Sequence, residues 1–279
     1  MQVFLNGRFV PVKNAVVPVL DRGFLYGDGL FETLLVRNSH PFRWARHIER
    51  LQLGARFLGI PLPFAPARLR AFAAELLERN RMPDAILRVT LSRGSGPRGY
   101  SPRGADQPVC VMTAHPAPAA NGNPLLKLAA ASTRLPAGEP LAGFKTCNKL
   151  VQILARREAQ ERGADEAILL NTRGKVAEAD SSNVFWIQRG EVRTPPMAAG
   201  ILGGVTRQAV LEICASFGVP WAERDASPAQ LFRADGVFLT SSVRGVAAAG
   251  SLDGRPLKQS PLVTRLQAEY RALILRETA

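Results

Sequence analysis

The chain has 279 residues, 46% of them hydrophobic and 21% charged, and a formal net charge of +13 at pH 7. This composition suits one large or two modest folded domains and argues against extensive disorder. No apolar run approaches the roughly 18–20 residues that a membrane span needs. The first residues lack the basic-then-apolar layout of a signal peptide. We therefore expect a cytoplasmic protein with no membrane partner.

The three cysteines, Cys110, Cys147 and Cys214, are scattered along the chain. Their spacing fits neither a disulfide framework nor a zinc cluster. We expect each to be an inert buried thiol in a reducing compartment, and we expect no bound metal ion.

The positive charge comes mainly from arginines spread along the whole chain, with no basic tail and no basic–aromatic clusters. One interpretation is a general preference for arginine over lysine. A second is that some arginines bind anionic substrates or a phosphate. A third is a basic, non-catalytic nucleic-acid-binding protein. The motifs described below have no role in that third class, so we expect a small anionic ligand and no nucleic-acid partner.

Turn residues and hydrophobic periodicity predict mixed strands and helices in the first part of the chain. Asn6-Gly7 predicts a hairpin between strands at 2–5 and 9–12. Further strands are predicted at 30–36, 85–92 and 109–114, helices at 44–58 and 67–80, and a loop rich in glycine, proline and arginine at 93–108.

The segment 116–124 is the predicted interdomain linker, because Pro, Gly, Ala and Asn dominate it. Beyond it, strands are predicted at 126–131, 166–170, 184–187 and 237–240, helices at 148–162, 206–217 and 261–277, and a turn at Asp253-Gly254. The apolar positions Leu150, Ile153 and Leu154 give the helix at 148–162 its periodicity. We therefore predict an α+β (or α/β) fold of two domains, a small N-terminal one at 1–115 and a larger one at 125–279.

Lys145 lies in the apolar segment LAGFKTCN, just ahead of a predicted helix. A partly desolvated lysine has a lowered pKa and can form a Schiff base with an aldehyde. The alternative is a lysine whose ammonium group reaches water.

Glu178, in VAEADSSNVFW, would need a cationic partner if it were buried, and a protonated pyridine nitrogen is one. The alternative is a surface glutamate at a turn. Asn183 is expected to tie down its own loop.

The glycine-rich segment GILGGVTR, residues 200–207, opens a predicted helix. Its backbone N–H groups and the hydroxyl of Thr206 could surround an anion, although a bare turn capped by threonine is the plainer interpretation. Ser241 and Ser242 end a predicted strand and could add donors. Arg50, in HIERL, could bind a phosphate bidentately or be an exposed helix arginine.

Together and in this order, these motifs resemble the fold-type-IV pyridoxal-phosphate (PLP) enzymes. That group includes branched-chain aminotransferases, D-amino-acid aminotransferases and 4-amino-4-deoxychorismate lyases. The resemblance covers nearly the whole chain, through DRGFLYGDGLFET, HIERL, FKTCNKL, VAEADSSNVFW, GILGGVTR and ADGVFLTSS. The run from Glu178 through Asn183, Thr194 and Arg207 has the family's spacing. Asp180 departs from it, since the family usually has a small or uncharged residue there.

The resemblance implies a fold like that of the D-amino-acid aminotransferases, with PLP between two domains of a homodimer. It implies that Lys145 forms the Schiff base with the cofactor and shuttles the proton. Glu178 would hold the pyridine nitrogen. The residues implied in phosphate binding are Arg50, Val205, Thr206, Ser241 and Ser242, the valine through its backbone N–H.

The segment SRGSGPRGYSPRG, residues 92–104, is similar to a run found in aminodeoxychorismate lyases. The resemblance therefore implies a lyase that converts 4-amino-4-deoxychorismate to pyruvate and 4-aminobenzoate, a folate precursor. Arg98 and Tyr100 would bind a substrate carboxylate, with Arg93 or Arg103 nearby. The alternative is a flexible hairpin tip with solvated arginines.

The rival within the family is a PLP-dependent aminotransferase (transaminase) acting on D-amino acids or related amines. It would share every cofactor residue. Those enzymes have an Arg-x-His arrangement that Arg98-Gly99-Tyr100 only half reproduces. They also tend to place tyrosine where this chain has Phe31, which we expect to line the substrate site. Branched-chain aminotransferases lack the arginine loop and rank third.

Overall fold

The computed structural model describes residues 1–118 and 124–279, and these divide into two compact units. Unit 1 contains residues 1–118, Phe144–Asn148 and Ile274–Ala279, whereas unit 2 contains the described residues up to Gly143 and Lys149–Leu273. Of the predicted linker 116–124, residues 119–123 lie outside the described residues. The prediction of one continuous domain at 125–279 differs from this division, because Phe144–Asn148 and the C-terminal residues belong to unit 1.

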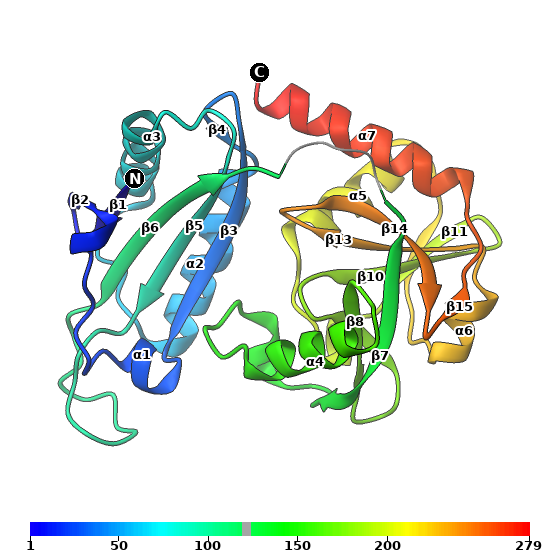
Figure 1. Ribbon diagram of the computed structural model, residues 1–279, viewed down its shortest axis with the longest axis horizontal. Helices are drawn as coiled ribbons and strands as arrows, with labels where there is room; N and C mark the ends of the chain where they lie inside the picture. The colour runs from blue at the N-terminus through cyan, green and yellow to red at the C-terminus, as the bar shows by residue number, and fades with distance from the viewer. Residues whose placement is uncertain (119–123) are drawn as a thin grey trace. The chain divides into compact units, whose positions relative to one another are not determined.

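Between residues 2 and 116, unit 1 forms a six-stranded antiparallel sheet in the order β2-β1-β6-β5-β3-β4 (Figure 1). The strands are β1 (Gln2–Leu5), β2 (Arg8–Pro11), β3 (Gly29–Arg37), β4 (His40–Pro41), β5 (Ala85–Ser92) and β6 (Val109–Pro116). Asn6 and Gly7 both have positive φ, as the hairpin turn between β1 and β2 requires. The predicted hairpin is therefore present.

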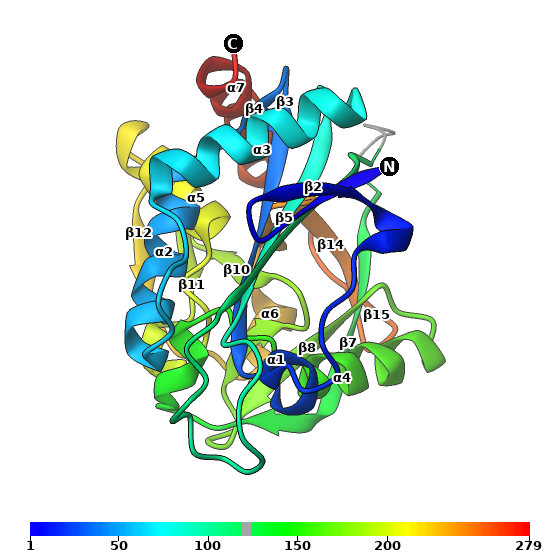
Figure 2. The same ribbon diagram turned by 90° about the vertical axis from the view of Figure 1, so that its left-hand side faces the viewer.

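Helices cover one face of this sheet. Helix α2 (Trp44–Leu58) contacts β3, and α3 (Pro66–Asn80) contacts β1 and β6 (Figure 2). Successive strand side chains point to opposite faces, so alternate residues such as Leu34, Leu87 and Met112 are fully buried in the core beneath these helices. The residues between them on each strand face the other way.

Between residues 126 and 256, unit 2 forms a nine-stranded sheet in the order β12-β11-β10-β13-β14-β7-β8-β9, with β15 attached to β14. The strands are β7 (Leu126–Leu135), β8 (Glu166–Asn171), β9 (Val176–Ala179), β10 (Asn183–Gln188), β11 (Glu191–Thr194), β12 (Trp221–Glu223), β13 (Gly236–Ser241), β14 (Gly245–Leu252) and β15 (Arg255–Pro256). Strand β9 also pairs back with β10 through Glu178 and Asn183, which closes a ring of strands. Glu178 therefore lies at the closure point.

Helix α4 (Leu150–Glu161) lies against β7 and β8, and α5 (Val205–Ser216) lies against β13 (Figure 1). The remaining helices are α1 (Arg22–Tyr26), α6 (Pro228–Arg233) and α7 (Pro261–Glu277), and short 3-10 turns occupy Val12–Asn14, Pro140–Gly143 and Met197–Ala199. None of the described helices is long and apolar enough to cross a membrane.

The α+β fold class is confirmed, and every predicted strand and helix is present with ends shifted by a few residues. One correction concerns which face of α4 is buried within the chain. Leu150 and Ile153 are 67% and 61% exposed, and the helix buries Ala155 and Ala159 instead. The periodicity therefore predicted the helix but not the face that packs within this chain. The strand β14 and several short elements, including α1 and β9, were not predicted.

Candidate active site

Lys145 is held against the edge of β3 by the backbone of its own short segment. The N–H of Phe31 donates to the carbonyl of Lys145, and the N–H of Cys147 donates to the carbonyl of Gly29, both at 2.9 Å. The Lys145 Nζ lies 4.7 Å from the centroid of the Phe31 ring. The structure therefore brings together the predicted Schiff-base lysine and one predicted substrate residue, and it fixes the backbone of that lysine on a buried strand.

Beneath the same strand, Glu32, His47 and Arg50 form a buried ionic cluster. Arg50 grips both carboxylate oxygens of Glu32, with Nε at 2.7 Å and Nη2 at 2.6 Å. His47 Nδ1 lies 2.7 Å from the same carboxylate. Burial by itself would raise the pKa of Glu32, but Arg50 and His47 outweigh it and lower that pKa to about 2. The alternative of a freely exposed Arg50 is wrong, because its side chain is only 13% exposed and is fixed by this pair.

In unit 2, Glu178 is a half-buried residue of β9, which excludes the alternative of a surface glutamate at a turn. Its Oε2 accepts a hydrogen bond from the Leu202 N–H at 2.9 Å. Asn183, opposite Glu178 on β10, donates from Nδ2 to the Leu202 carbonyl at 2.8 Å. Glu178 and Asn183 thus hold the glycine-rich segment from both sides, and Asn183 ties down a loop as predicted.

The same segment leads into α5 through a very close contact. A Cβ on Gly204 would lie 2.1 Å from Asn183 Oδ1, so no other residue fits there without rearrangement. Gly204 is the N-cap of α5 and makes no side-chain cap hydrogen bond. The N–H groups of the first turn, at Val205 and Thr206, are left without a side-chain cap from this residue, and a helix N-terminus of this kind attracts anions.

Thr206 and the end of β13 meet at one tyrosine side chain. The Thr206 Oγ1 lies 3.4 Å from the hydroxyl of Tyr270. A Cβ on Gly245, the first residue of β14, would lie 2.9 Å from the Tyr270 ring. Ser241 and Ser242 begin the turn between β13 and β14 and are half-buried. Thr206 and the pair of Ser241 with Gly245 are thus linked through Tyr270, whereas Arg50 lies in unit 1.

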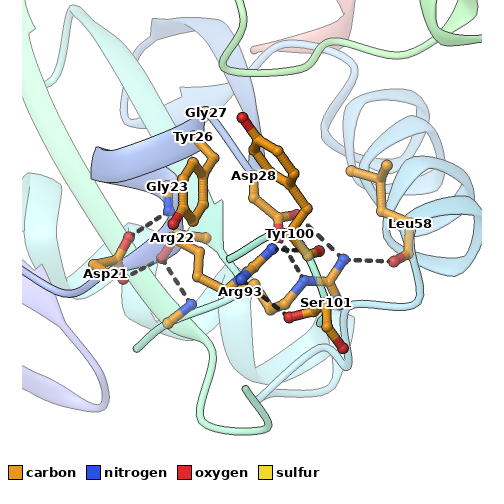
Figure 3. A network of polar contacts seen from close by, with 12 residues as sticks. Asp21, Arg22, Gly23, Tyr26, Gly27, Asp28, Leu58, Arg93, Tyr100 and Ser101 are labelled. Atoms are coloured by element: carbon orange, nitrogen blue, oxygen red, sulfur yellow. Dashed lines mark hydrogen bonds and ion pairs between the residues drawn. The ribbon is translucent and has the colours of Figure 1, made fainter. Parts of the chain in front are cut away.

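The loop between β5 and β6 is clamped by two arginines and one aspartate (Figure 3). Asp28 Oδ2 accepts hydrogen bonds from Arg22 Nε at 2.9 Å and Arg93 Nε at 2.7 Å. Arg22 also donates to the carbonyls of Gly99, Tyr100 and Ser101 at 2.8 to 3.2 Å. Arg93 donates to the carbonyls of Leu58 and Gly59. The loop is thus held by its backbone.

Arg98 and Tyr100, the predicted substrate residues of this loop, project outward. Arg98 is exposed, Tyr100 is 87% exposed, and the Tyr100 ring makes an edge contact with Tyr26 at 5.6 Å. Among the described residues, no hydrogen bond, ion pair or ring contact joins either side chain to Lys145 or Phe31. Arg93 and Arg103 were the two further arginines expected near the substrate. Arg93 is buried and paired with Asp28, so of these two only Arg103 is exposed.

Known proteins share the sequence pattern of this chain. The family model for class IV amino-transferases matches residues 29–252. The D-alanine aminotransferase of Bacillus licheniformis is 32% identical over 287 residues, covering 100% of this chain and 99% of the relative. The chain belongs to the class IV aminotransferase family.

Two solved structures of this family show the same fold. The 4-amino-4-deoxychorismate lyase from Pseudomonas aeruginosa superposes with a TM-score of 0.85 and 36% identity, covering 97% of this chain and 98% of that one. A branched-chain amino acid aminotransferase from T.th., solved with pyridoxamine 5'-phosphate, gives a TM-score of 0.92 and 29% identity, with coverages of 99% and 94%. The predicted membership of the fold-type-IV PLP enzymes is therefore confirmed. The chain is an enzyme of this family, which argues against the nucleic-acid-binding alternative.

Several residues of the family's spacing prove to be structural. The hydroxyl of Thr194 donates to the Val184 carbonyl at 2.9 Å, and Arg207 pairs with Glu223 at 2.6 Å. Asp180, the departure from the family's usual pattern, pairs with Arg156 of α4 and accepts the Ala167 N–H at 2.7 Å. The extra carboxylate therefore joins α4 to β8 and does not touch the proposed cofactor residues.

The cysteines follow the prediction at two positions of three. Cys110 and Cys214 are buried, and burial raises the pKa of their thiols to about 12 and about 11. Cys147 is only half-buried, because it lies on the segment that pairs with β3. The expectation of an inert buried thiol is therefore wrong in its burial for Cys147. Among the described residues, no group of three His, Cys, Asp or Glu side chains could hold a metal ion.

Three charged residues of unit 1, Glu32, Arg88 and Arg22, were not predicted as site residues from the sequence. Glu32 interrupts the apolar run LFETLLV, and Arg88 interrupts AILRVTLS. A single charge in an otherwise apolar strand is a usable signal, because an ion placed there needs a partner or a ligand. Arg22 gave no such signal, because the loop carbonyls that it binds lie far along the chain.

Proposed function

We propose that this chain is an aminodeoxychorismate lyase, which converts 4-amino-4-deoxychorismate to 4-aminobenzoate and pyruvate. The lyase assignment depends on the arginine loop, whose sequence SRGSGPRGYS resembles that of such lyases. Arg22 binds the backbone carbonyls of this loop, and Arg93 at its start pairs with Asp28. A loop fixed in this way can present Arg98 and Tyr100 without a large entropic cost on binding. The 36% identity to the Pseudomonas aeruginosa lyase supports the proposal.

Pyridoxal phosphate is the cofactor of this family, and the residues here fit it. In unit 2, the N-terminus of α5, which has no side-chain cap, offers backbone N–H groups to a phosphate. Val205, Thr206, Ser241 and Ser242 would hold the phosphate there, and we propose Arg50 as a further ligand. Glu178, positioned by the Leu202 N–H, would hold the ring nitrogen, and Lys145 would hold the aldehyde. When bound, the cofactor supplies an aldehyde that condenses with amines and a ring that accepts an electron pair.

The residues of the chain then act on the substrate amine. The Nζ of Lys145 takes the proton from the ring carbon that bears the amino group, as a positioned general base. The carboxylate of Glu178 keeps the cofactor's ring nitrogen protonated and so favours the loss of that proton. The bond between the adjacent ring carbon and the enolpyruvyl oxygen breaks, and the enolpyruvate gains a proton to become pyruvate. The six-membered ring becomes aromatic, which supplies much of the driving force.

Formation of 4-aminobenzoate tests the proposal directly. The purified protein, loaded with PLP, is supplied with 4-amino-4-deoxychorismate by a coupled synthase, and 4-aminobenzoate and pyruvate are measured. We expect both products in equal amounts, and none without PLP. A protein that carries PLP but forms no 4-aminobenzoate would refute the lyase.

A second candidate is an aminotransferase for D-amino acids. It is favoured by the 32% identity to the D-alanine aminotransferase of Bacillus licheniformis over the full length of the chain. The cofactor residues would be the same, so the discriminating measurement is transfer of the amino group from D-alanine to 2-oxoglutarate. Transfer without any lyase activity would establish this candidate. Both activities in one protein would support a shared site with two outcomes.

We also propose that the enzyme is a homodimer. Leu150, Ile153 and Leu154 form an exposed apolar stripe on α4, and Val16, Val19 and Phe24 are more than 70% exposed in unit 1. Exposed apolar side chains grouped in this way on one element typically mark an interface between proteins. The cytoplasmic location stays a prediction that cell fractionation would test.

A further inference from the structure

The buried side of helix α7 carries a tyrosine. The helix buries Val263, Leu266, Gln267 and Tyr270, a spacing that puts these side chains on one side of a helix. Gln267 donates from Nε2 to the Val246 carbonyl of β14 at 3.3 Å, so this side of α7 faces the sheet of unit 2. Tyr270 is only 2% exposed. Its hydroxyl group therefore lies in the interior of unit 2.

The Tyr270 side chain touches both segments that supply the proposed phosphate ligands of unit 2. Its ring packs so closely on Gly245 that a Cβ there would lie 2.9 Å away, and Gly245 pairs with Ser241 at the end of β13. Its hydroxyl oxygen lies 3.4 Å from Oγ1 of Thr206, in the first turn of α5. The end of β13 and the start of α5 are thus both in contact with one residue of α7.

The Thr206 hydroxyl can bind a phosphate and Tyr270 together in only one arrangement. A threonine hydroxyl has one hydrogen to donate and lone pairs that accept. Because an anionic oxygen can only accept, the hydrogen of Thr206 goes to the phosphate, and Thr206 accepts a hydrogen bond from the Tyr270 hydroxyl. Hydrogen bonds in such a chain polarise one another, which strengthens the donor next to the anion.

Packing alone does not require a hydroxyl at position 270. Phe185 and Phe238, which are fully buried in the same unit, fill their places with rings that carry none. A buried phenol loses its hydration, and this loss is offset only where the hydroxyl finds a polar partner. The contact with Thr206 supplies such a partner.

We infer that the Tyr270 hydroxyl orients the Thr206 hydroxyl toward the cofactor phosphate, which makes α7 a part of the cofactor site. Tyr270 is a positioning residue, since it acts through Thr206. The inference rests on the proposed phosphate site at the start of α5, and it holds for the lyase and for the aminotransferase alike. The separation of 3.4 Å is long for two hydrogen-bonded hydroxyls, so we expect a modest contribution.

The test compares two forms of the cofactor that differ only in the phosphate. The enzyme freed of cofactor is titrated with PLP and with pyridoxal, which lacks the phosphate, and dissociation constants are obtained from the absorbance. We expect Tyr270→Phe, which keeps the ring against Gly245, to weaken PLP binding roughly 3- to 10-fold, the loss expected for a neutral hydrogen bond. Pyridoxal binding should be unchanged.

A double-mutant cycle separates the orientation of Thr206 from a general structural effect. Thr206→Val keeps the shape of the side chain but removes the hydroxyl, and it should weaken PLP binding roughly 10- to 100-fold, as for a hydrogen bond to a charged group. In that background Tyr270→Phe should cause no further loss, because Tyr270 acts through Thr206. A further loss of the same size would overturn the inference. So would a Tyr270→Phe enzyme that binds PLP as the wild type does.

Tyr26→Phe is the matched control. The Tyr26 hydroxyl accepts the Gly99 N–H at 3.3 Å in unit 1, so this substitution removes a tyrosine hydroxyl contact of similar length from the other unit. It should leave both affinities unchanged. A purely structural role for Tyr270 would weaken the binding of pyridoxal as well as of PLP, and that result would contradict the inference.

Failure of the inference and failure of the proposed function give different results. If Thr206→Val weakens PLP binding but Tyr270→Phe does not, the phosphate site stands and the role of Tyr270 is refuted. If the wild type forms no 4-aminobenzoate but the cycle behaves as expected, the lyase is refuted and the role of Tyr270 is supported. If Thr206→Val leaves PLP binding unchanged, the phosphate site and the inference fail together.

Amide hydrogen exchange in the wild type replaces the cycle if Tyr270→Phe does not fold. PLP should slow exchange in α7 more than pyridoxal does, because only PLP carries the phosphate that fixes Thr206 and, through it, Tyr270. Equal protection of α7 by both ligands would overturn the inference.

Discussion

Arg22 and Asp28 lie at the two ends of one short helix and turn, and their side chains pair at 2.9 Å. Asp28 also forms an ion pair with Arg93, which follows directly after β5. Arg22 in addition donates hydrogen bonds to backbone carbonyls of the arginine loop (Figure 3). Two buried cations thus share one carboxylate, and burial, which alone would raise the pKa of Asp28, is outweighed by both arginines, so that this pKa is lowered. The segment before β3 therefore sets the shape of a loop some seventy residues later.

Replacement of Arg22 by alanine should release this loop. The carbonyls of Gly99, Tyr100 and Ser101 would lose their common donor, while Asp28 would keep Arg93. We expect KM for the substrate to rise roughly 10-fold, which corresponds to one or two hydrogen bonds to a charged group, with a smaller change in kcat. Steady-state kinetics measure the split. Arg70→Ala, at an exposed arginine of α3, is the control and should show no comparable rise.

Arg98→Ala tests whether the clamped loop presents a substrate ligand. Arg98 is exposed and makes no hydrogen bond or ion pair within the described residues, so its loss should cost little stability. If it binds a carboxylate, kcat/KM should fall roughly 10- to 100-fold while the thermal midpoint is unchanged. An unchanged kcat/KM would mean that the side chain is solvated throughout the reaction.

The sequence predicted the parts of this enzyme that local chemistry dictates. Asn6-Gly7 specified a hairpin, and the helical periods at 44–58 and 261–277 matched α2 and α7 at both ends. Strand β14, with the sequence GVAAAGSL, was missed because alanine and glycine have poor strand propensity. Its pairing with β13 and β7 makes it a strand, and no local pattern records that pairing.

The site was predicted to a similar extent. Lys145, Glu178 and the 200–207 segment carry enough local sequence to be recognised, and the structure places Lys145 beside Phe31. The partners of these residues were not predictable, because Glu32 with Arg50 and Arg22 with Tyr100 meet only after the strands have paired. Charged residues inside apolar strands were the one signal that remained unused.

Lys145→Ala should abolish turnover and leave the fold intact. The backbone of this segment is held by the hydrogen bonds from the Phe31 N–H to the Lys145 carbonyl and from the Cys147 N–H to the Gly29 carbonyl, which the substitution preserves, so the segment should keep its place. Loss of a positioned general base alone costs about 10²- to 10⁴-fold, and loss of the covalent cofactor link adds to it. The checks are kcat, the absorbance of the lysine-bound cofactor and far-ultraviolet circular dichroism. Lys13→Ala, at an exposed lysine, is the control, and full activity in Lys145→Ala would refute the assignment.

His47 should make the stability of the protein depend on pH. Burial lowers the pKa of His47 from 6.5, and Glu32 opposes this shift without reversing it. Below pH 6.5 the unfolded chain therefore binds a proton that the folded chain does not, so stability is complete above 6.5 and decreases as the pH falls further. The free energy of unfolding in urea, measured at about pH 7 and about pH 5, should decrease less in His47→Gln than in the wild type.

His115→Gln supplies the comparison for that measurement, since His115 is an exposed residue near the end of β6. It should retain the full decrease in stability between the two pH values. The opposite ordering, with His47→Gln as pH-dependent as the wild type, would show that the buried ring does not lose its proton on folding.

Ile153→Glu tests the proposed dimer. Ile153 is 61% exposed at the centre of the apolar stripe on α4, so a carboxylate there should be tolerated by the isolated chain. In an interface it would be desolvated without a partner, and we expect the dimer to dissociate roughly 30- to 1,000-fold more readily, as at a central interface residue. Sedimentation velocity measures the mass of both proteins. Gln160→Glu adds the same charge at an exposed site on the same helix and should leave the dimer intact. A monomeric wild type would refute the dimer, and an Ile153→Glu protein as dimeric as the wild type would remove α4 from the interface.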